Sequence, residues 1–509
     1  MGRGRSPAGG CALDPEVPAL LLRIDHNPFH HGTLGAARSL GRAGVTVHAI
    51  AEGGRGPLAR SRYVLRTYRQ PSVTAGAFGV HAALREAAAG LGTPAVLLPM
   101  DDLGAIEAAR LPPALAARFL LPAQPPGLAA RVADKAELAG VCAEAGVPYP
   151  KTVRPGGAAE AEAAARRLGR PVVAKWSKPW LLPPGRGLRS TTLLRSPREA
   201  AALYERTPEA GSALLLQEFL PPGPGGDWFC HAYADRAGRL RAGGTGRKLR
   251  SWPPGAGLTA VGRWEHDARI ADSARRLVET LGYRGILDLD LRIDAAGGVP
   301  RLLDFNPRPG AQFRLFTDRG GLDVVRALHL DLTGRPLPGR APAPGRRFTV
   351  GTYALLSALK GRAGTERAPA ATGDGADSAG GGGDGGGGPA ATGGPGDARR
   401  RGGREGAWWA ADDPVPALVM SLAWTLHLAR RASTRRTPAR PRPAEPTVRT
   451  GSAESAAPEE SAVRTGSAES AAPAESPVRT GPAESPAAAA PATSAAHAEK
   501  ASSTSCTTS

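Results

Sequence analysis

The sequence predicts a fold of mixed α/β and α+β class, followed by a long low-complexity region. Between residues 17 and 50 an apolar strand, a loop, a helix and a second strand follow one another, which is the order of a parallel β-α-β unit. Residues 285–310 hold two alternating segments separated by a Gly-containing turn, which predict an antiparallel hairpin. Beyond residue 361 most of the chain is rich in Gly, Ala, Pro and Ser and lacks the large apolar side chains that a core requires.

The bulk properties restrict the class of protein. A chain of 509 residues predicts two to four domains. The formal net charge of +19 comes mostly from scattered arginines without a nucleic-acid-binding motif, so we expect no nucleic-acid partner. The four cysteines are widely spaced, and no apolar run approaches the ~20 residues that span a bilayer. We therefore expect a cytoplasmic protein without stable membrane insertion.

Residues 17–121 predict an open α/β domain after a flexible N-terminus at 1–16. Its elements are expected at Val17–Ile24, Leu34–Ala43, Val45–Ile50 and Ala95–Pro99. The loop after the first strand, Asp25–Gly32, holds three histidines. Because ligands bind at the carboxyl ends of parallel strands, this loop is a candidate substrate contact. Packing and capping of the next helix are the alternative explanation for its histidines.

Residues 122–360 predict a second domain with two subdomains, at about 130–220 and 221–345. Asp134, as an N-cap with Glu137 three residues later, predicts a helix that places Lys135 at its first position. The remaining elements are strands at Pro171–Trp176 and Ser212–Leu220 and helices at Ala268–Leu281 and Gly321–His329.

The C-terminal part predicts little ordered structure. Residues 361–404 form a Gly-rich insert that we expect to be disordered. Residues 405–431 have the spacing of an amphipathic helix. Residues 432–509 contain an imperfect repeat of about 15 residues that begins at Val448, Val463 and Val478, and it has no apolar face to stack. We therefore expect 432–509 to be a disordered tail.

The hairpin at 285–310 places acidic side chains where an ordinary hairpin would avoid them. Ile286–Ile293 alternates, with Asp288 and Asp290 on one face, and the returning strand carries Leu303 and Phe305 on its apolar side. In the simplest register Asp290 lies opposite Asp304 and Asp288 lies opposite Asn306. Opposed like charges are destabilising, and oxygen ligands of this kind suit Mg²⁺. The alternative is a solvated polar face balanced by Arg292 and Arg301.

These motifs together resemble the ATP-grasp superfamily of ATP-dependent carboxylate–amine ligases, over roughly Leu20 to Leu330. The resemblance implies an ATP-grasp fold with an N-terminal open α/β (pre-ATP-grasp) lobe, and ATP gripped between two α+β subdomains. It implies that lysines bind the phosphates, a hinge segment pairs with adenine and a carboxylate accepts the ribose hydroxyls. The residues that match these roles are Lys135, Lys175, Gln217, Glu218, Phe219, Leu220 and Asp227.

The same resemblance implies a metal triad and two further basic residues. Asp290, Asp304 and Asn306 match the triad, and Asp288 is an additional or outer ligand. The family usually has Glu where this chain has Asp304, and the shorter side chain reaches less far. Lys248 matches a third phosphate contact. Arg308 fits a role on the transferred phosphoryl group or the substrate carboxylate.

The implied function is an ATP-dependent ligase that activates a carboxylate as an acyl phosphate and joins it to an amine. Its cofactors would be ATP and Mg²⁺ or Mn²⁺, and its partners small-molecule carboxylates and amines, with a homodimer compatible with the sequence. One alternative is a non-catalytic ATP-binding regulatory or scaffold protein on the same fold. Another is a basic protein that binds anionic membrane surfaces through the Arg-rich tail and the Trp408–Arg431 helix.

Overall fold

The computed structural model describes residues 11–27, 30–51, 54, 56–72, 75–253, 257–295, 298–365 and 403–436, with only the backbone course at 224–225, 359–365 and 427–436. The chain divides into Met1–Pro438 and Ala439–Ser509, and every described residue belongs to the first unit. The Gly-rich insert predicted at 361–404 and the tail predicted at 432–509 lie outside the described residues, apart from their ends.

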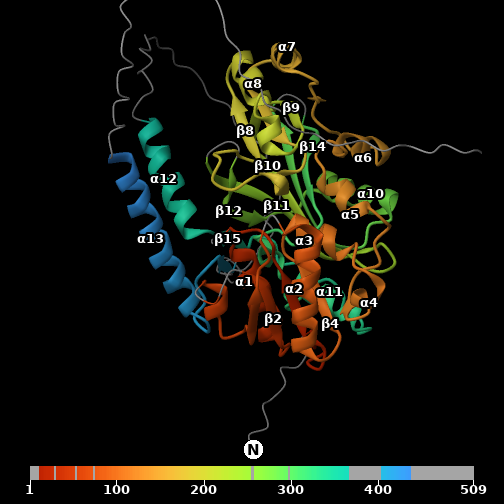
Figure 1. The fold of residues 1–509 in the computed structure, drawn as a ribbon. Helices are drawn as coiled ribbons and strands as arrows, with labels where there is room; N and C mark the ends of the chain where they lie inside the picture. The colour runs from red at the N-terminus through yellow and green to blue at the C-terminus, as the bar shows by residue number, and fades with distance from the viewer. Residues whose placement is uncertain are drawn as a thin grey trace, which may run out of the picture. The chain divides into compact units, whose positions relative to one another are not determined.

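The first lobe is a parallel five-stranded sheet in the order β3-β2-β1-β4-β5. Figure 1 shows its strands β2 and β4 with the helices α1 to α4 around them, coloured red to orange. Its strands are short and apolar, and β1 is fully buried because it lies at the centre of the sheet. The elements are β1 Ala19–Leu22, α1 His31–Arg42, β2 Val47–Ala51, β3 Arg66–Arg69, α2 Gly76–Leu91, β4 Ala95–Pro99, α3 Asp102–Ala108, α4 Pro113–Ala116 and β5 Phe119–Leu120. The predicted β-α-β unit is confirmed, and its helix begins earlier because His30 caps it.

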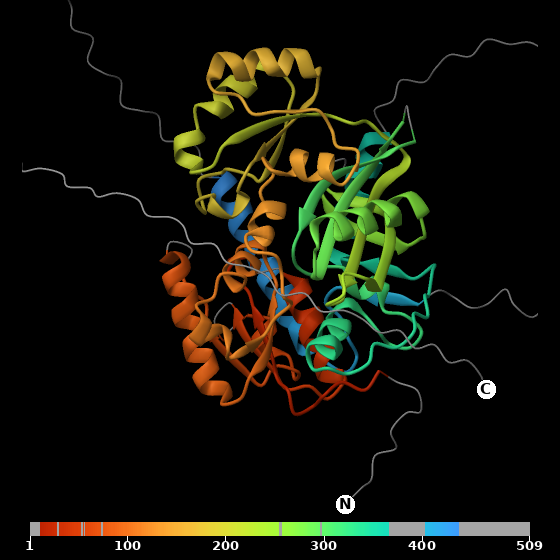
Figure 2. The ribbon, with the colours of Figure 1, turned by 90° about the vertical axis from the view of Figure 1, so that its right-hand side faces the viewer.

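A small antiparallel sheet follows, in the order β6-β9-β7-β8. Helices α7 and α8 cover it and share an apolar core with β7 and β9. The elements are α5 Leu128–Ala133, α6 Leu138–Glu144, β6 Thr152–Val153, α7 Ala158–Leu168, β7 Val172–Trp176, β8 Thr191–Leu194, α8 Pro197–Tyr204, α9 Thr207–Ala210 and β9 Leu214–Glu218. In Figure 2 this sheet and its helices lie together, coloured from orange to yellow-green.

The third part is a seven-stranded sheet in the order β14-β13-β10-β11-β12-β15-β16. Helices α5, α6 and α10 pack on one face, while α1 and α11 share a core with the other. The elements are β10 Pro222–Ala234, β11 Leu240–Trp252, β12 Leu258–Trp264, α10 Ala268–Leu281, β13 Gly285–Asp294, β14 Pro300–Asn306, α11 Val324–Leu332, β15 Arg347–Thr349, α12 Gly351–Thr365, β16 Arg404–Gly406 and α13 Val415–Arg436. Because α1 belongs to the first lobe, this shared core joins that lobe to the large sheet.

The register predicted for the acidic hairpin is confirmed. Asp290 pairs with Asp304 and Asp288 with Asn306. A bulge then shifts the pairing, so that Leu291 lies opposite Leu302, and Leu302 rather than Leu303 enters the core. The prediction that Leu303 lies on the apolar side was wrong, because strict alternation cannot reveal an extra residue in one strand.

The segment after residue 402 joins the body in a way that the sequence did not indicate. Arg404–Gly406 forms β16, which pairs in parallel with β15 at the edge of the large sheet. Trp408 is buried in the core shared with the first lobe. The helix expected from residue 405 therefore begins only at Val415, after a strand and a turn.

A buried ion pair holds this segment to the first lobe. Asp413 accepts hydrogen bonds from Arg38 Nε at 2.9 Å and Ser61 Oγ at 2.7 Å. Both Arg38 and Asp413 are almost completely buried. The neighbouring Asp412 instead pairs with Arg42 at the surface. Among the described residues, no helix has the length and apolar character needed to cross a membrane.

These adjacent aspartates give a matched test of the anchor. Asp413→Ala should lower the free energy of unfolding by about 3–5 kcal/mol, because it leaves the Arg38 guanidinium buried without its partner. Asp412→Ala should cost about 1 kcal/mol or less, because its partner is solvated. Urea denaturation followed by circular dichroism measures both, and equal losses would contradict the assignment.

Candidate functional site

Acidic and amide side chains line one face of the β13–β14 hairpin. Three of its carboxylates, those of Asp288, Asp290 and Asp304, are each paired with a cation from a different part of the chain. Lys135 Nζ donates to Asp304 Oδ1, Lys248 Nζ lies 2.7 Å from Asp290 Oδ1, and Arg308 Nη1 lies 3.2 Å from Asp288 Oδ2. The structure thus brings six of the residues predicted from the sequence to one place.

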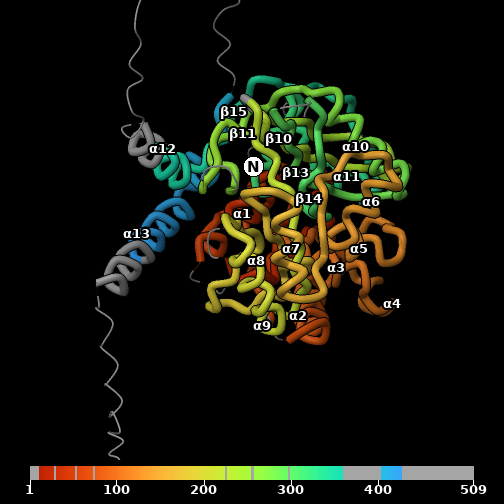
Figure 3. Tube along the Cα trace, turned by 90° about the horizontal axis from the view of Figure 1, so that it is seen from above, coloured from red at the N-terminus to blue at the C-terminus, as the bar shows by residue number. Residues whose placement is uncertain are grey.

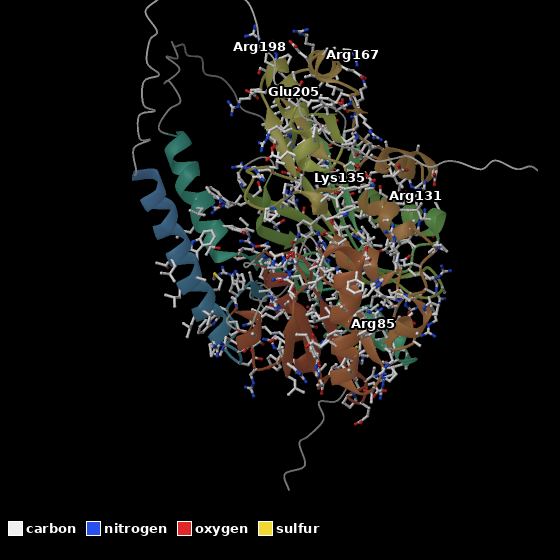
Figure 4. The ribbon with its side chains drawn as sticks, viewed as in Figure 1. Arg85, Arg131, Lys135, Arg167, Arg198 and Glu205 are labelled. Atoms are coloured by element: carbon white, nitrogen blue, oxygen red, sulfur yellow. The ribbon has the colours of Figure 1, made fainter. Side chains whose placement is uncertain are left out.

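Two lysines reach the hairpin from the side of the small-sheet subdomain, one on the strand β7 and one in the turn between α5 and α6. Lys175 lies near the end of β7, and its Nζ donates to the carbonyl of Leu303 at 2.6 Å. Leu303 is the residue that the bulge leaves unpaired, so the bulge supplies the acceptor. Figure 4 shows Lys135 at the base of this subdomain, away from Arg167, Arg198 and Glu205 at its far end.

The predicted position of Lys135 on a helix was wrong. Helix α5 ends at Ala133 with Asp134 as its C-cap, and α6 begins only at Leu138. Lys135 lies in the turn between them, where its backbone N–H donates to the carbonyl of Ser177 at 2.9 Å. The Asp134 carboxylate accepts hydrogen bonds from Ala136 N and Ser177 Oγ. The turn is therefore fastened to the segment that follows β7, which places both lysines side by side.

Burial and neighbouring charges shift the ionisation of these groups. Burial lowers the pKa of Lys175 to about 8, against the opposing field of Asp304. For Asp290 burial favours the neutral form, but the ammonium of Lys248 outweighs it and lowers the pKa. Burial and the adjacent Asp290 raise the pKa of Asp288. The site thus holds a lysine that gains from an added anion and a carboxylate that gains from an added cation.

The predicted hinge and the predicted ribose carboxylate are held together by one arginine. Arg292 Nε donates to Asp227 Oδ1 at 2.6 Å, and its Nη1 donates to the carbonyl of Leu220 at 3.0 Å. The same guanidinium lies 5.8 Å from the centre of the Phe219 ring. These contacts join the end of the small sheet to β10 and β13.

The other two hinge side chains are engaged in the framework. Gln217 is buried, and its amide donates to Thr152 Oγ1 at 3.0 Å. Glu218 accepts from Lys151 N at 2.9 Å and Arg301 Nη1 at 2.8 Å. The hinge therefore offers its backbone, more than these side chains, to a ligand.

Arg308 links the hairpin to the first lobe. Its Nε donates to Asp102 Oδ1 at 3.1 Å, while Nη1 reaches Asp288. Asp102 follows β4, at the carboxyl edge of the parallel sheet beside β1. This is the edge at which open α/β sheets bind ligands.

A buried histidine completes this corner of the site. His231 on β10 pairs with Asp288 across the sheet, and its Nε2 lies 3.3 Å from Asp288 Oδ1. A Cβ on Gly310 would overlap His231 and lie 2.7 Å from Asp288 Cγ, so only glycine allows the Pro309–Gly310 backbone to pass here. Asp288 is therefore held from three directions.

The histidine-rich loop contributes structure at two of its three positions. His30 caps α1, and its Nδ1 lies 2.7 Å from Thr33 Oγ1. His31 is buried with its ring centre 5.6 Å from that of Phe348 and 6.0 Å from that of Trp408. Burial lowers the pKa of both rings, so they stay neutral. Only His26 is exposed.

The donor set of the hairpin fits a hard divalent cation. Asp290, Asp304 and Asn306 present oxygens on one face in facing register, which is the ligand chemistry of Mg²⁺. Asp288 Oδ1 is buried and accepts no hydrogen bond from any described residue. In the described part of the chain, no group of three or more His, Cys, Asp or Glu side chains is close enough to hold a metal ion unaided. Metal binding at Asp290, Asp304 and Asn306 stays a prediction.

The three parts and their order define an ATP-grasp fold, as the sequence motifs predicted. N5-carboxyaminoimidazole synthetase from Staphylococcus aureus, solved as a complex with ADP, superposes with a TM-score of 0.50 and 12% sequence identity. The superposition covers 70% of this chain and 88% of that chain. No protein-family model matches the chain.

One curated protein is similar to this chain in sequence as well. The D-aspartate ligase of Enterococcus faecium (strain Aus0004) is 27% identical over 220 residues, which are 41% of this chain and 51% of that protein. The match thus spans about half the length of that relative. An L-amino acid ligase from Bacillus licheniformis superposes with a TM-score of 0.46 and 14% identity, over 62% of this chain and 74% of that one.

Sequence reasoning missed three members of the site: Asp102, His231 and Arg292 in its bridging role. Asp102 had a usable signal, because it follows a strand of the parallel sheet. His231 is a polar residue inside the apolar run Trp228–Tyr233, which marks a buried group in need of a partner. From the sequence, Arg292 was expected to neutralise the acidic face in solvent. Its hydrogen bonds to Asp227 and to the Leu220 carbonyl become visible only in the structure.

The lowered pKa of Lys175 gives a test of ligand binding by pH. A bound polyphosphate favours the charged ammonium, so the affinity for MgADP should hold below pH 8 and then fall, by up to about tenfold per pH unit. Lys175→Arg keeps its charge throughout and should bind with little pH dependence. Isothermal titration calorimetry between about pH 7.5 and 9.5 measures this, and parallel curves for both proteins would contradict the role of Lys175.

Proposed function

We propose that the chain is an ATP-dependent carboxylate–amine ligase, which activates a carboxylate as an acyl phosphate and joins it to an amine. The observation that carries this proposal is the meeting of two lysines, one from the small sheet and one from the turn before α6, with the carboxylate-bearing strand β14. Lys135 contacts Asp304, and Lys175 contacts the backbone one residue before it. A polyphosphate with a divalent cation matches this alternation of positive and negative groups.

In this proposal the basic residues bind the phosphates, and the hinge and Asp227 bind the nucleoside. Lys135 and Lys175 bind the nucleotide phosphates as point charges, and Lys248 on β11 contributes a third positive charge. Asp227 and the hinge backbone at 217–220 take the ribose and the adenine. The ion pairs among these residues would be exchanged for contacts with the phosphates.

The metal ligands would be Asp290, Asp304 and Asn306, with Asp288 in support. A divalent cation held there would neutralise charge on the phosphate oxygens. The Asp304 side chain is shorter than the glutamate usual in the superfamily, and its Oδ1 already accepts from Lys135 Nζ.

Arg308 is suited to the reacting groups. Its guanidinium lies between Asp288 of the hairpin and Asp102 of the first lobe, which is where the nucleotide subdomains meet the parallel sheet. In the proposed reaction the substrate carboxylate attacks the γ-phosphate and releases ADP, which leaves an acyl phosphate, and Arg308 stabilises the negative charge of the transferred group. The amine then displaces phosphate, so the protein needs no nucleophile of its own.

The curated relative supports a proposal for the substrate class. That protein is named for D-aspartate, and we propose an amino acid as one of the two substrates here. The substrate would lie at the carboxyl edge of the first sheet, near Asp102 and Arg308.

The experiment is a phosphate-release screen of the purified chain with ATP, Mg²⁺ and panels of amino acids and other carboxylates and amines, beginning with D-aspartate. Lys175→Ala and Asp304→Ala should each lower kcat/KM by about a hundredfold or more. Arg198→Ala and Asp272→Asn are control variants, because Arg198 is exposed on α8 at the far end of the small sheet (Figure 4) and Asp272 lies on α10, where it pairs with Arg275. They should retain turnover.

Two results would count against the proposal. Turnover that survives Lys175→Ala and Asp304→Ala would remove the assigned site. Tight MgATP binding with no turnover across the panels would favour the alternative, a non-catalytic nucleotide-binding protein. The presence of Asp304, where the superfamily usually has glutamate, is the feature that points to this alternative.

A further inference from the structure

Helix α13 presents an exposed aliphatic face. Val415, Leu418, Leu422 and Leu426 are 47%, 62%, 64% and 50% exposed. Their spacing of three, four and four residues places them along one side of the helix. Ser421 and Thr425 are the other exposed residues of this stretch, so the face carries no charge. A single exposed leucine needs no explanation, but an uncharged row of four does.

The opposite side of α13 is fixed to the body. Ala417 and Met420 are buried in the core shared by the first lobe and the large sheet. Trp424 packs edge-on against Tyr353 of α12, with ring centres 6.3 Å apart. Asp413, two residues before the helix, forms the buried pair with Arg38. Figure 3 shows α13 beside α12 at the margin of the described chain. These contacts set the rotation of the helix, so its aliphatic face points outward.

The chain's own long segments outside the structure lack the side chains to cover this face. Residues 366–402 contain no Leu, Ile, Val, Met or aromatic residue. Residues 437–509 contain only three such residues, Val448, Val463 and Val478. Burial of aliphatic surface needs an aliphatic partner. We therefore expect another molecule to cover the aliphatic face of α13.

The charge next to this face indicates the kind of molecule that covers it. The last seven residues of α13 hold four arginines and no acidic residue: Arg430, Arg431, Arg435 and Arg436. Two copies of this chain whose helices pack in parallel through this face would bring two such clusters together and repel each other. A cluster of four to eight basic residues on an amphipathic helix is the pattern that binds anionic lipid.

We propose that α13, with the arginines of its last two turns, docks the protein on the surface of an anionic lipid bilayer. The leucines would lie at the boundary between headgroups and acyl chains, and the arginines would contact the lipid phosphates. The helix would lie along the surface, because its other side stays packed on the body. This docking is independent of the ligase reaction and does not involve its site.

The test uses the full chain and sedimentation with vesicles. One set contains phosphatidylcholine alone, and the other contains about one third phosphatidylglycerol. We expect binding to the anionic set only, weakened when salt rises from about 0.1 to 0.5 M. The double variant Leu418→Ser/Leu422→Ser should lose about tenfold or more in affinity. The matched control is Leu65→Ser/Leu258→Ser, since those leucines are 72% and 63% exposed elsewhere.

Sedimentation velocity and thermal denaturation accompany the binding assay. The Leu418→Ser/Leu422→Ser variant should unfold like the native protein and keep any nucleotide binding, because the residues are exposed and far from the hairpin. Equal vesicle binding by this variant and its control would overturn the proposal. So would a native dimer that this variant converts to a monomer, with no vesicle binding by either, because the occupant would then be a second copy.

Discussion

The structure depends on an electrostatic conflict in the β13–β14 hairpin. Its register places Asp290 against Asp304 and Asp288 against Asn306, so like charges face each other at the distance of a cross-strand pair. The conflict is relieved by cations from outside the hairpin: Lys135 from the turn before α6, Lys248 from β11 and Arg308 from the loop after β14. Because these groups come from distant parts of the sequence, neutralising the hairpin also joins the subdomains around it.

The same contacts explain how a framework can serve as a binding site. Lys175 is buried and bonded to one carbonyl, with a pKa of about 8, so its charge is stabilised less well than in water. The negative charge of Asp288 is also poorly stabilised, since burial beside Asp290 raises its pKa. A nucleotide with a divalent cation would supply both missing charges at once. The ion pairs that hold the subdomains together are thus the contacts that we propose for exchange with substrate.

The segment after residue 402 is held to the rest of the chain by buried contacts on one side only. Its strand β16 and the buried Asp413 tie it to two parts of the body, and Trp408 fills the core between them. This attachment leaves α13 with one buried side and one aliphatic side in solvent. Fixing one side of a helix determines where the other side points, so the arrangement converts an amphipathic segment into a surface of defined direction. In the proposed docking, the arginines at the C-terminal end of α13 would add a long-range attraction to anionic lipid that aliphatic contacts lack.

The sequence alone determined the local structure and the chemistry of the residue types. Alternation gave the strands of the hairpin and its register, because the side-chain period of a strand is two and the turn sets the pairing. The apolar strands and the helix between them gave the first lobe, and Ala268–Leu281 was predicted to the residue. The motifs also named the lysines and carboxylates that converge. Only the tertiary structure decided the bulge at Leu303, the turn that holds Lys135, the return of Arg404–Gly406 to the large sheet, and the pairing of His231 with Asp288. Each of these depends on contacts between residues far apart in the chain, and no local periodicity or spacing carries that information.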